Sequence, residues 1–176
     1  MTGSRNHHSL LKYGMALIAS LAVLSTILAG PVSAHTPNNY QKARDHLRAR
    51  ARNVTGTPYR YGGSSPSGFD CSGFTRWTFD GHGARLPRTS MEQFKLATRA
   101  GHKRVWKRSK LQVGDLVFHK TTSARVGHVG IFIGNGKFIS STSSDGVRVR
   151  SIWDRYYWGP RWVGATRVPA TIRYKG

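Results

Sequence analysis

One cysteine is the residue of this chain with the clearest potential for chemistry. Cys71 is the only cysteine in the 176 residues and lies where a glycine-rich loop gives way to an amphipathic run. Phe74, Trp77 and Thr78 follow it at three- and four-residue spacing, which predicts a helix that starts at or just before Cys71 and ends near residues 81–83. A thiol at a helix N-terminus lies near unpaired N–H groups, which lower its pKa from a free value of about 8.5. Together with His128, this helix terminus is expected to lower the pKa of Cys71 by more than about one unit. The alternative is a small buried side chain, which is what most lone cysteines are.

A cysteine nucleophile is activated by an imidazole brought near in space, and His128 is the candidate. It lies in a predicted strand over residues 126–133, in which positions 129, 131 and 133 form one apolar face. His128 falls on the opposite face with Gly130, whose missing side chain leaves room beside the ring. Val126 and Phe132 share this second face, so we expect it to be covered. His128 is therefore interpreted as either the base for the thiol or a satisfied core histidine.

Helices come first in the chain and short strands follow. An amphipathic helix is predicted over residues 40–52, a loop over 55–68, and a short helix that begins at the capping-box spacing of Thr89 and Glu92 and ends at Gly101. Five short strands are predicted at residues 116–118, 126–133, 138–140, 147–150 and 162–168. This order is typical of an α+β domain.

The first 34 residues are interpreted as a secretory signal peptide. Arg5 and Lys12 precede an apolar run over residues 15–29, and small residues at positions 32 and 34 form a cleavage site. An uncleaved membrane anchor is the alternative. We expect residues 35–176 to form a single domain with its core at about 40–168, and no stable membrane span after cleavage. An unpaired thiol in an exported protein favours a reactive role for Cys71.

The charge of the chain predicts an anionic partner. The whole sequence carries a net charge of +21, and the 26 basic and 7 acidic residues after position 34 leave +19 (26 minus 7). Export argues against nucleic acid, and no zinc-finger spacing, RNP-like segment or phosphate loop is present. Anionic cell-envelope polymers fit better, with a surface charged for solubility as the alternative. No histidine pair has metal-ligand spacing, so we expect no metal and no other cofactor.

Five segments occur in order along the domain: GTPYRYGG (56–63), FDCSGF (69–74), LPRTS (86–90), GDLVF (114–118) and GHVGIFIG (127–134). Together they resemble the successive signatures of the NlpC-type cell-wall cysteine peptidases, over about residues 40–168. The resemblance implies a papain-like α+β fold, with N-terminal helices that carry the nucleophile packed on an antiparallel sheet of about five strands. It also implies hydrolysis of peptidoglycan stem peptides between D-glutamate and the following diamino acid.

The resemblance also assigns roles to individual residues. Cys71 would be the nucleophile and His128 its base, and Tyr59 matches a tyrosine whose hydroxyl helps to hold the oxyanion, beside the backbone N–H of Cys71. Asp70 and Ser72 match positions that in some members hold the free amine of the stem peptide. Tyr61, the second aromatic residue of the loop before them, is a further candidate for substrate binding.

One position departs from the family pattern. Members commonly place a histidine where this chain has Ser140, so Ser140 is predicted to replace the residue that orients His128. A three-residue loop over 134–136 with Gly136 left-handed would pair Gly130 with Ser140 and put Ser140 on the face of His128, whereas a two-residue turn would not. Thr142 would then lie opposite His128 and is the competing orienting residue.

The expected protein is thus a secreted, cell wall-associated, monomeric cysteine peptidase. Two alternatives use other features of the same sequence. One is a cationic cell-envelope-binding protein without catalytic activity. The other is an acyl transferase that passes the acyl group from the same thiol to an amine instead of water.

Overall fold

The computed structural model describes residues 37–169, with side chains from Asn39 onward. The predicted signal peptide lies outside these residues. Within the described part of the chain, no helix combines the length and the apolar character needed to cross a membrane.

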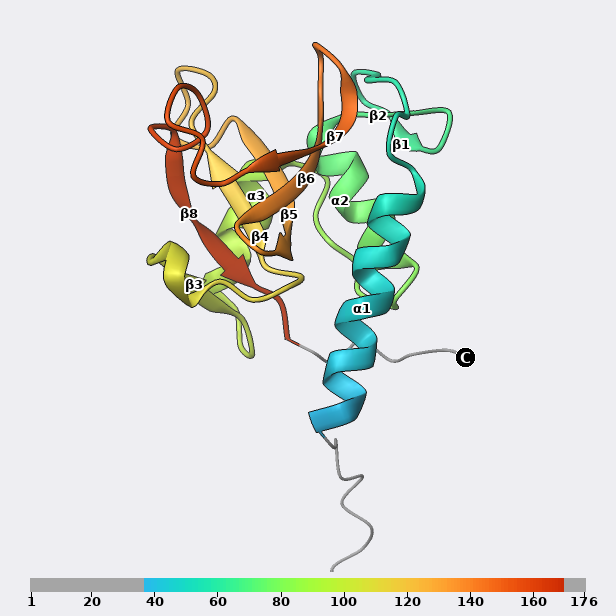
Figure 1. The fold of residues 1–176 in the computed structure, drawn as a ribbon, viewed down its shortest axis with the longest axis vertical. Coiled ribbons are helices and arrows are strands. Elements are labelled where there is room, and N and C mark those ends of the chain that lie inside the picture. Colours follow the sequence, from blue (N-terminus) through green and yellow to red (C-terminus); the bar gives the residue numbers. More distant parts are fainter. Residues whose placement is uncertain (1–36, 170–176) are drawn as a thin grey trace, which may run out of the picture. The chain divides into compact units, whose positions relative to one another are not determined.

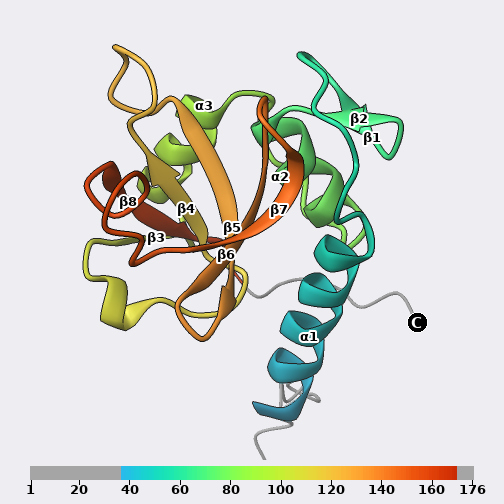
Figure 2. The ribbon, with the colours of Figure 1, turned by 45° about the horizontal axis from the view of Figure 1, so that its top comes forward.

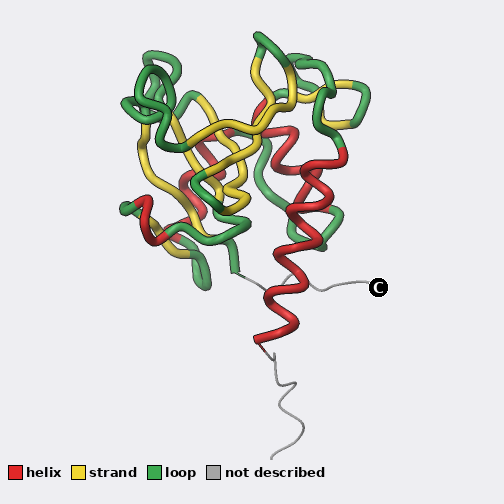
Figure 3. Tube along the Cα trace, viewed as in Figure 1, coloured by secondary structure: helices red, strands yellow, loops and turns green. Residues whose placement is uncertain are grey.

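Between residues 37 and 169 the helices are α1 (Pro37–Asn53), α2 (Cys71–Asp80), α3 (Ser90–Lys95) and two 3-10 turns, η1 (Leu96–Thr98) and η2 (Arg108–Lys110). The strands are β1 (Ser64–Ser65), β2 (Gly68–Phe69), β3 (Lys103–Val105), β4 (Leu116–His119), β5 (His128–Gly134), β6 (Lys137–Thr142), β7 (Gly146–Ser151) and β8 (Trp162–Arg167). The predicted α+β class is confirmed, and Figure 3 shows α1 and α2 beside the strands of the sheet.

The main sheet has six antiparallel strands in the order β3-β8-β4-β5-β6-β7, and β1 pairs only with β2. Helix α2 packs against β5 and β6, α3 packs against β4 and β8, and α1 flanks α2 (Figures 1 and 2). The sequence predicted about five strands, and β3 is the additional one. It has three residues, two of them basic, at the edge of the sheet, so it lacks the alternation that predicts a strand.

Helix α2 begins at Cys71 as predicted, because the residue before it caps the helix. The Asp70 backbone is extended (φ −88°, ψ 176°), and its carboxylate accepts a hydrogen bond from the Gly73 N–H at 2.7 Å. The predicted capping box of α3 is also present, between Thr89 and Glu92. This helix ends in η1 and not at Gly101, whose left-handed backbone (φ +78°) forms the turn before β3.

The two faces of the sheet carry separate apolar clusters. The face toward the helices contains Val129, Ile131 and Ile133 of β5, as predicted, and the other face contains Phe132. The second face is covered, since Phe132 is only 8% exposed. The prediction for Val126 is wrong: Val126 packs in the first cluster, because β5 begins at His128 and the strand alternation does not reach it.

The hairpin between β5 and β6 differs from the prediction. Asn135 (φ 51°) and Gly136 (φ 65°) form a two-residue turn, and Gly134 pairs with Lys137, so the three-residue loop is wrong. Asparagine and glycine both tolerate a left-handed backbone, which is what this turn requires.

A β-bulge nevertheless produces the register that the longer loop would have given. The pairing shifts by one residue between Phe132 and Gly134, so that Phe132 lies opposite Phe138. A Cβ added at Gly130 would lie 3.0 Å from the Ser140 Cβ, so these two residues face each other across the strands. Ser140 therefore lies on the face of His128.

Candidate active site

The predicted nucleophile and base line one pocket of about 280 Å³. Cys71 comes from the start of α2, His128 from the start of β5 and Tyr59 from the loop before β1. The rest of the lining comes from the end of β6 and from the β4–β5, β6–β7 and β7–β8 connections: Thr121, Thr122, Gly127, Ser141, Thr142, Ser143, Tyr157 and Trp158. The fold thus brings together three predicted residues from segments that are far apart in the sequence.

Backbone N–H groups surround the sulfur of Cys71. They belong to Cys71 and Ser72 at the helix start and to Val129, the residue directly after His128. Val129 follows His128 directly on β5, and α2 packs against this strand, so the sulfur lies near the start of β5. N–H groups at this place can also hold an oxyanion that forms next to the sulfur.

Burial raises the pKa of the Cys71 thiol, and the neighbouring Asp70 carboxylate raises it further, while the three N–H groups act in the opposite direction. The prediction of a lowered pKa is therefore wrong for the free protein. The physical reason is that desolvation of the thiolate outweighs the helix N-terminus. Cys71 is a neutral thiol at pH 7 and needs a base to become a nucleophile.

His128 is in the right state to be that base. Its side chain is 6% exposed, and burial, with a contribution from the Arg150 charge, lowers its pKa to about 3. The imidazole is therefore neutral at pH 7 and can accept a proton. Its Nε2 is buried and has no hydrogen-bond partner among the described residues, which leaves Nδ1 as the nitrogen that can face the pocket.

Tyr59 is held beside the thiol by its own loop. It forms a parallel bridge with Phe69, and the Arg60 N–H donates to the Phe69 carbonyl at 3.0 Å. Burial raises the pKa of Tyr59, and the nearby Cys71 adds to the effect, so the phenol remains protonated. Its hydroxyl is therefore a hydrogen-bond donor in a residue that lines the same pocket as Cys71.

Asp70 and Ser72 are engaged with a residue that the sequence analysis did not single out. Arg88 forms an ion pair with Asp70 at 2.5 Å and donates to the Ser72 hydroxyl at 3.0 Å. Burial acts to raise the pKa of Asp70, but hydrogen bonds from Arg88 and two backbone N–H groups hold it below its ordinary value. A substrate amine would have to share this carboxylate with Arg88. The position of Arg88 within the LPRTS segment was the available signal.

The remaining predicted site residues lie in different surroundings. Tyr61 is 91% exposed and is not part of the pocket lining. Ser140 is completely buried, and its hydroxyl has no partner among the described residues. Thr142 does not serve as the competing orienting residue in this structure, because its hydroxyl accepts from Arg150 at 2.7 Å and donates to Asp145 at 2.5 Å.

A second histidine lies on the same face as His128 and was missed. His119 ends β4 directly opposite His128 and is completely buried. In the sequence it only extended an apolar strand, so nothing there distinguished it. Among residues 39–169 there is no group of three or more His, Cys, Asp or Glu side chains that could hold a metal ion.

The α+β fold, with a cysteine at a helix N-terminus beside a histidine at the start of a central antiparallel strand, defines a papain-like domain. The sequence profile of the NlpC/P60 family matches residues 56–167. The chain belongs to this family.

Curated relatives and solved structures agree with this assignment. Murein DD-endopeptidase MepH of Escherichia coli (strain K12) is 40% identical over 139 residues, which are 76% of this chain and 49% of that protein. Probable endopeptidase NlpC of the same strain is 42% identical over 115 residues, or 64% of this chain and 70% of that protein. The NlpC/p60 domain of the peptidoglycan hydrolase SagA is 30% identical, with a TM-score of 0.57 over 71% of this chain and 98% of that domain.

The chain spans about half or less of the length of several of these relatives. The share is 49% for MepH and 33% for the probable peptidoglycan endopeptidase LytE of Bacillus subtilis (strain 168). The likeness therefore concerns the domain described above.

Proposed function

We propose that this protein is a cysteine peptidase that hydrolyses peptide bonds in peptidoglycan stem peptides. The observation that carries the proposal is the position of Cys71 at the N-terminus of α2, in one pocket with His128 and Tyr59. The names of the relatives, which include murein and peptidoglycan endopeptidases, support the choice of substrate.

The mechanism starts from a neutral thiol and a neutral imidazole. As the sulfur attacks the amide carbonyl, its proton passes to Nδ1 of His128, so that the thiolate forms only with substrate in place. The N–H groups at the start of α2 and the hydroxyl of Tyr59 hold the oxyanion. The imidazolium then protonates the leaving amine as the C–N bond breaks. Finally, His128 takes a proton from water, which attacks the thioester and releases the acid and the free thiol.

Digestion of purified peptidoglycan, followed by mass spectrometry of the released muropeptides, tests this function. We expect new amine and carboxylate ends with the wild type and none with Cys71→Ala or His128→Ala. Ser65→Ala, in the exposed β1 strand, is the matched control and should behave as the wild type. Binding of wild type without any cleavage would instead favour the cationic envelope-binding protein.

The same experiment identifies the bond. Our first candidate is the bond between D-glutamate and the diamino acid, which the family resemblance favours. The name DD-endopeptidase, which MepH carries, favours a bond between two D-configured residues as the second candidate. The two cleavages leave fragments of different mass. A mass that includes an added amine would indicate acyl transfer instead of hydrolysis.

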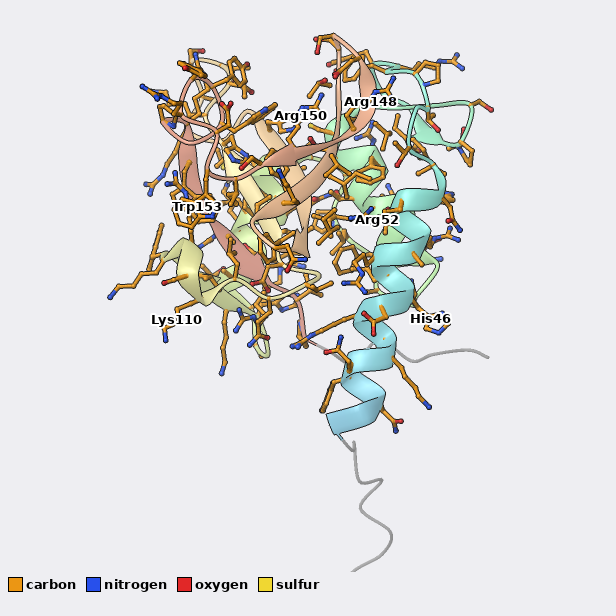
Figure 4. All side chains as sticks on the ribbon, viewed as in Figure 1. His46, Arg52, Lys110, Arg148, Arg150 and Trp153 are labelled. Carbon is orange, nitrogen blue, oxygen red and sulfur yellow. The ribbon has the colours of Figure 1, made fainter. Side chains whose placement is uncertain are left out.

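We further propose that the protein acts outside the cell at the wall as a monomer, after loss of residues 1–34, and that anionic envelope polymers attract it. Basic side chains project from several elements, including Arg52 on α1, Lys110 on η2 and Arg148 on β7, all exposed (Figure 4). Attraction of this kind is screened beyond about 8 Å at physiological ionic strength. Binding to sacculi should therefore weaken steeply with salt, whereas turnover of a small soluble stem peptide should change much less. A parallel decline of both would show that the charges act in the pocket itself.

A further inference from the structure

A second imidazole lies beside the candidate base. His119 on β4 is the cross-strand partner of His128 on β5, and the two ring centroids are 6.4 Å apart with an interplanar angle of 49°. The His119 side chain is completely buried, and neither of its ring nitrogens has a hydrogen-bond partner among the described residues. A buried polar group left without a partner costs about 1–3 kcal/mol, so this arrangement calls for a reason.

Aromatic side chains enclose this imidazole. The ring of His119 stacks on Phe138 with centroids 5.0 Å apart. The rings of Trp158 and Trp162 meet it in T-shaped contacts, with centroids 5.1 and 6.1 Å away. A β-bulge in the pairing of β4 with β8 places Trp162 opposite His119. An apolar ring would suit these walls better than an imidazole does, since it would leave no polar atom unpaired.

Gly130 lies on the same face of the sheet, against Phe138 and Ser140. A Cβ at this position would lie 2.7 Å from the Phe138 ring and 3.0 Å from the Ser140 Cβ. The missing side chain lets His119 from β4 reach Phe138 on β6 across the intervening strand. Four buried polar atoms without a partner therefore lie on one face of three neighbouring strands: two on His119, Nε2 of His128, and the hydroxyl of Ser140.

The proposed mechanism requires one tautomer of His128. If Nδ1 is to accept the proton of the thiol, the neutral ring must carry its own proton on the buried Nε2. That N–H needs an acceptor to hold the tautomer and the ring orientation. Thr142 is already engaged by Arg150 and Asp145, which leaves His119 and Ser140 as the neighbouring groups that can accept.

We propose that His119 is the positioning residue for His128. Its ring accepts the hydrogen bond from the His128 Nε2–H through one bridging hydroxyl or water, because a centroid separation of 6.4 Å is too long for a direct bond between ring nitrogens. The inference rests on the proposed role of His128 as the base. In this proposal the residue that orients His128 lies on β4 and not at Ser140 on β6. The two strands flank β5, which carries His128.

The charge state of His119 suits this role. Burial lowers the pKa of His119 well below its ordinary value of 6.5, and the neighbouring His128 and Arg108 act in the same direction. The ring is therefore neutral and keeps one nitrogen with a free lone pair. A neutral acceptor can stabilise the His128 imidazolium that forms during attack without competing for its proton.

Two substitutions of His119 separate a positioning role from a packing role. His119→Phe keeps an aromatic ring beside Phe138, Trp158 and Trp162 but removes the hydrogen-bond acceptor. His119→Gln loses the ring but restores an acceptor. We expect His119→Phe to lower kcat about 10- to 100-fold with a change in KM of about twofold or less, and His119→Gln to regain most of the lost kcat. Trp162→Phe changes one of the rings packed on His119 without removing a hydrogen-bond acceptor. It is the matched control and should keep kcat near that of wild type.

The tautomer of His128 can be measured without any substrate. In ¹⁵N spectra of histidine-labelled protein, with the His128 signals assigned by comparison with His128→Gln, we expect a protonated Nε2 in the wild type and a larger Nδ1–H population in His119→Phe. An Nδ1–H tautomer in the wild type would overturn the proposal. So would a His119→Phe variant with unchanged tautomer, or one whose loss of kcat His119→Gln fails to restore. Because the spectra need no turnover, they decide about His119 even if the wild type cleaves no peptidoglycan.

Discussion

The two faces of the central sheet use the same strands for different purposes. On the helix side, β5 contributes Val129 and Ile131 to a cluster in which Phe69 and Phe74 are completely buried. On the other side, the same strands contribute apolar residues together with His119, His128 and Ser140, whose buried polar atoms have no partner within residues 39–169. The first face pairs apolar groups with apolar groups, and the second buries polar groups at the expense of stability.

This difference shows how the fold separates stability from chemistry. The apolar face anchors α2 against the sheet and so determines where Cys71 lies. The polar face holds an imidazole that is neutral because it is buried, which is the state that a base requires. Sites that need unusual protonation states commonly reduce stability, and here the opposite face of the same sheet compensates.

The largest expected effect is on the helix side. Phe74→Ala should lower the free energy of unfolding by about 3–5 kcal/mol, because it removes a completely buried ring that packs edge-on against Phe69. His119→Phe, on the other face, should change the free energy of unfolding by only about 1 kcal/mol, because it removes a buried nitrogen without a direct partner but also the bridged hydrogen bond to His128. Urea denaturation measures both. Similar losses for the two variants would contradict the division between the faces.

The second effect is a loss of stability in acid. The folded pKa values of His119 and His128 lie below the ordinary 6.5. Below pH 6.5 these two imidazoles therefore bind protons in the unfolded chain before they do so in the native chain. The free energy of unfolding should therefore fall as the pH drops below 6.5, by up to about 1.4 kcal/mol per pH unit for each imidazole. For His128 this fall continues to about pH 3.

Denaturation midpoints between about pH 6.5 and 5 isolate this contribution, because carboxylates titrate mainly at lower pH. His119→Phe should make the pH dependence shallower. His82, whose pKa burial also lowers, lies away from the pocket and remains as a constant background in both proteins. An equally steep decline without His119 would show that this imidazole is protonated in the native state.

The third prediction concerns the thiol of Cys71, at the start of α2. Because burial raises the pKa of Cys71, its alkylation by iodoacetamide should accelerate only above the ordinary thiol value of about 8.5. His128→Ala opens the pocket and should shift the inflection downward. An inflection well below the ordinary value in the wild type would instead indicate a thiolate–imidazolium pair that exists before substrate binds.

The smallest expected effect is that of Ser140→Ala. The variant removes one neutral hydroxyl that has no partner among the described residues, so stability should change by about 1 kcal/mol or less. Turnover should fall about tenfold or less, whereas Cys71→Ala should abolish it. A loss as severe as that of His128→Ala would show that the orientation of the base depends on the Ser140 hydroxyl.

Much of the site follows from local sequence, because local rules determine its parts. Asp70 caps a helix whose apolar spacing begins at Cys71, so the sequence could place the helix start at or just before Cys71. Strand alternation placed His128 on the face of Gly130. The family signatures named Tyr59 in a loop that does line the pocket. The roles of these residues in catalysis remain predictions.

Only the tertiary structure decided the electrostatics and the neighbours of the base. The pKa of Cys71 depends on how completely the sheet buries the sulfur, and this desolvation outweighs the helix terminus that the sequence shows. The register of β6 depends on a bulge that cancels a two-residue turn. The meeting of His119 with His128 depends on the pairing of β4 with β5, and pairing between strands is a long-range property that neither segment carries by itself.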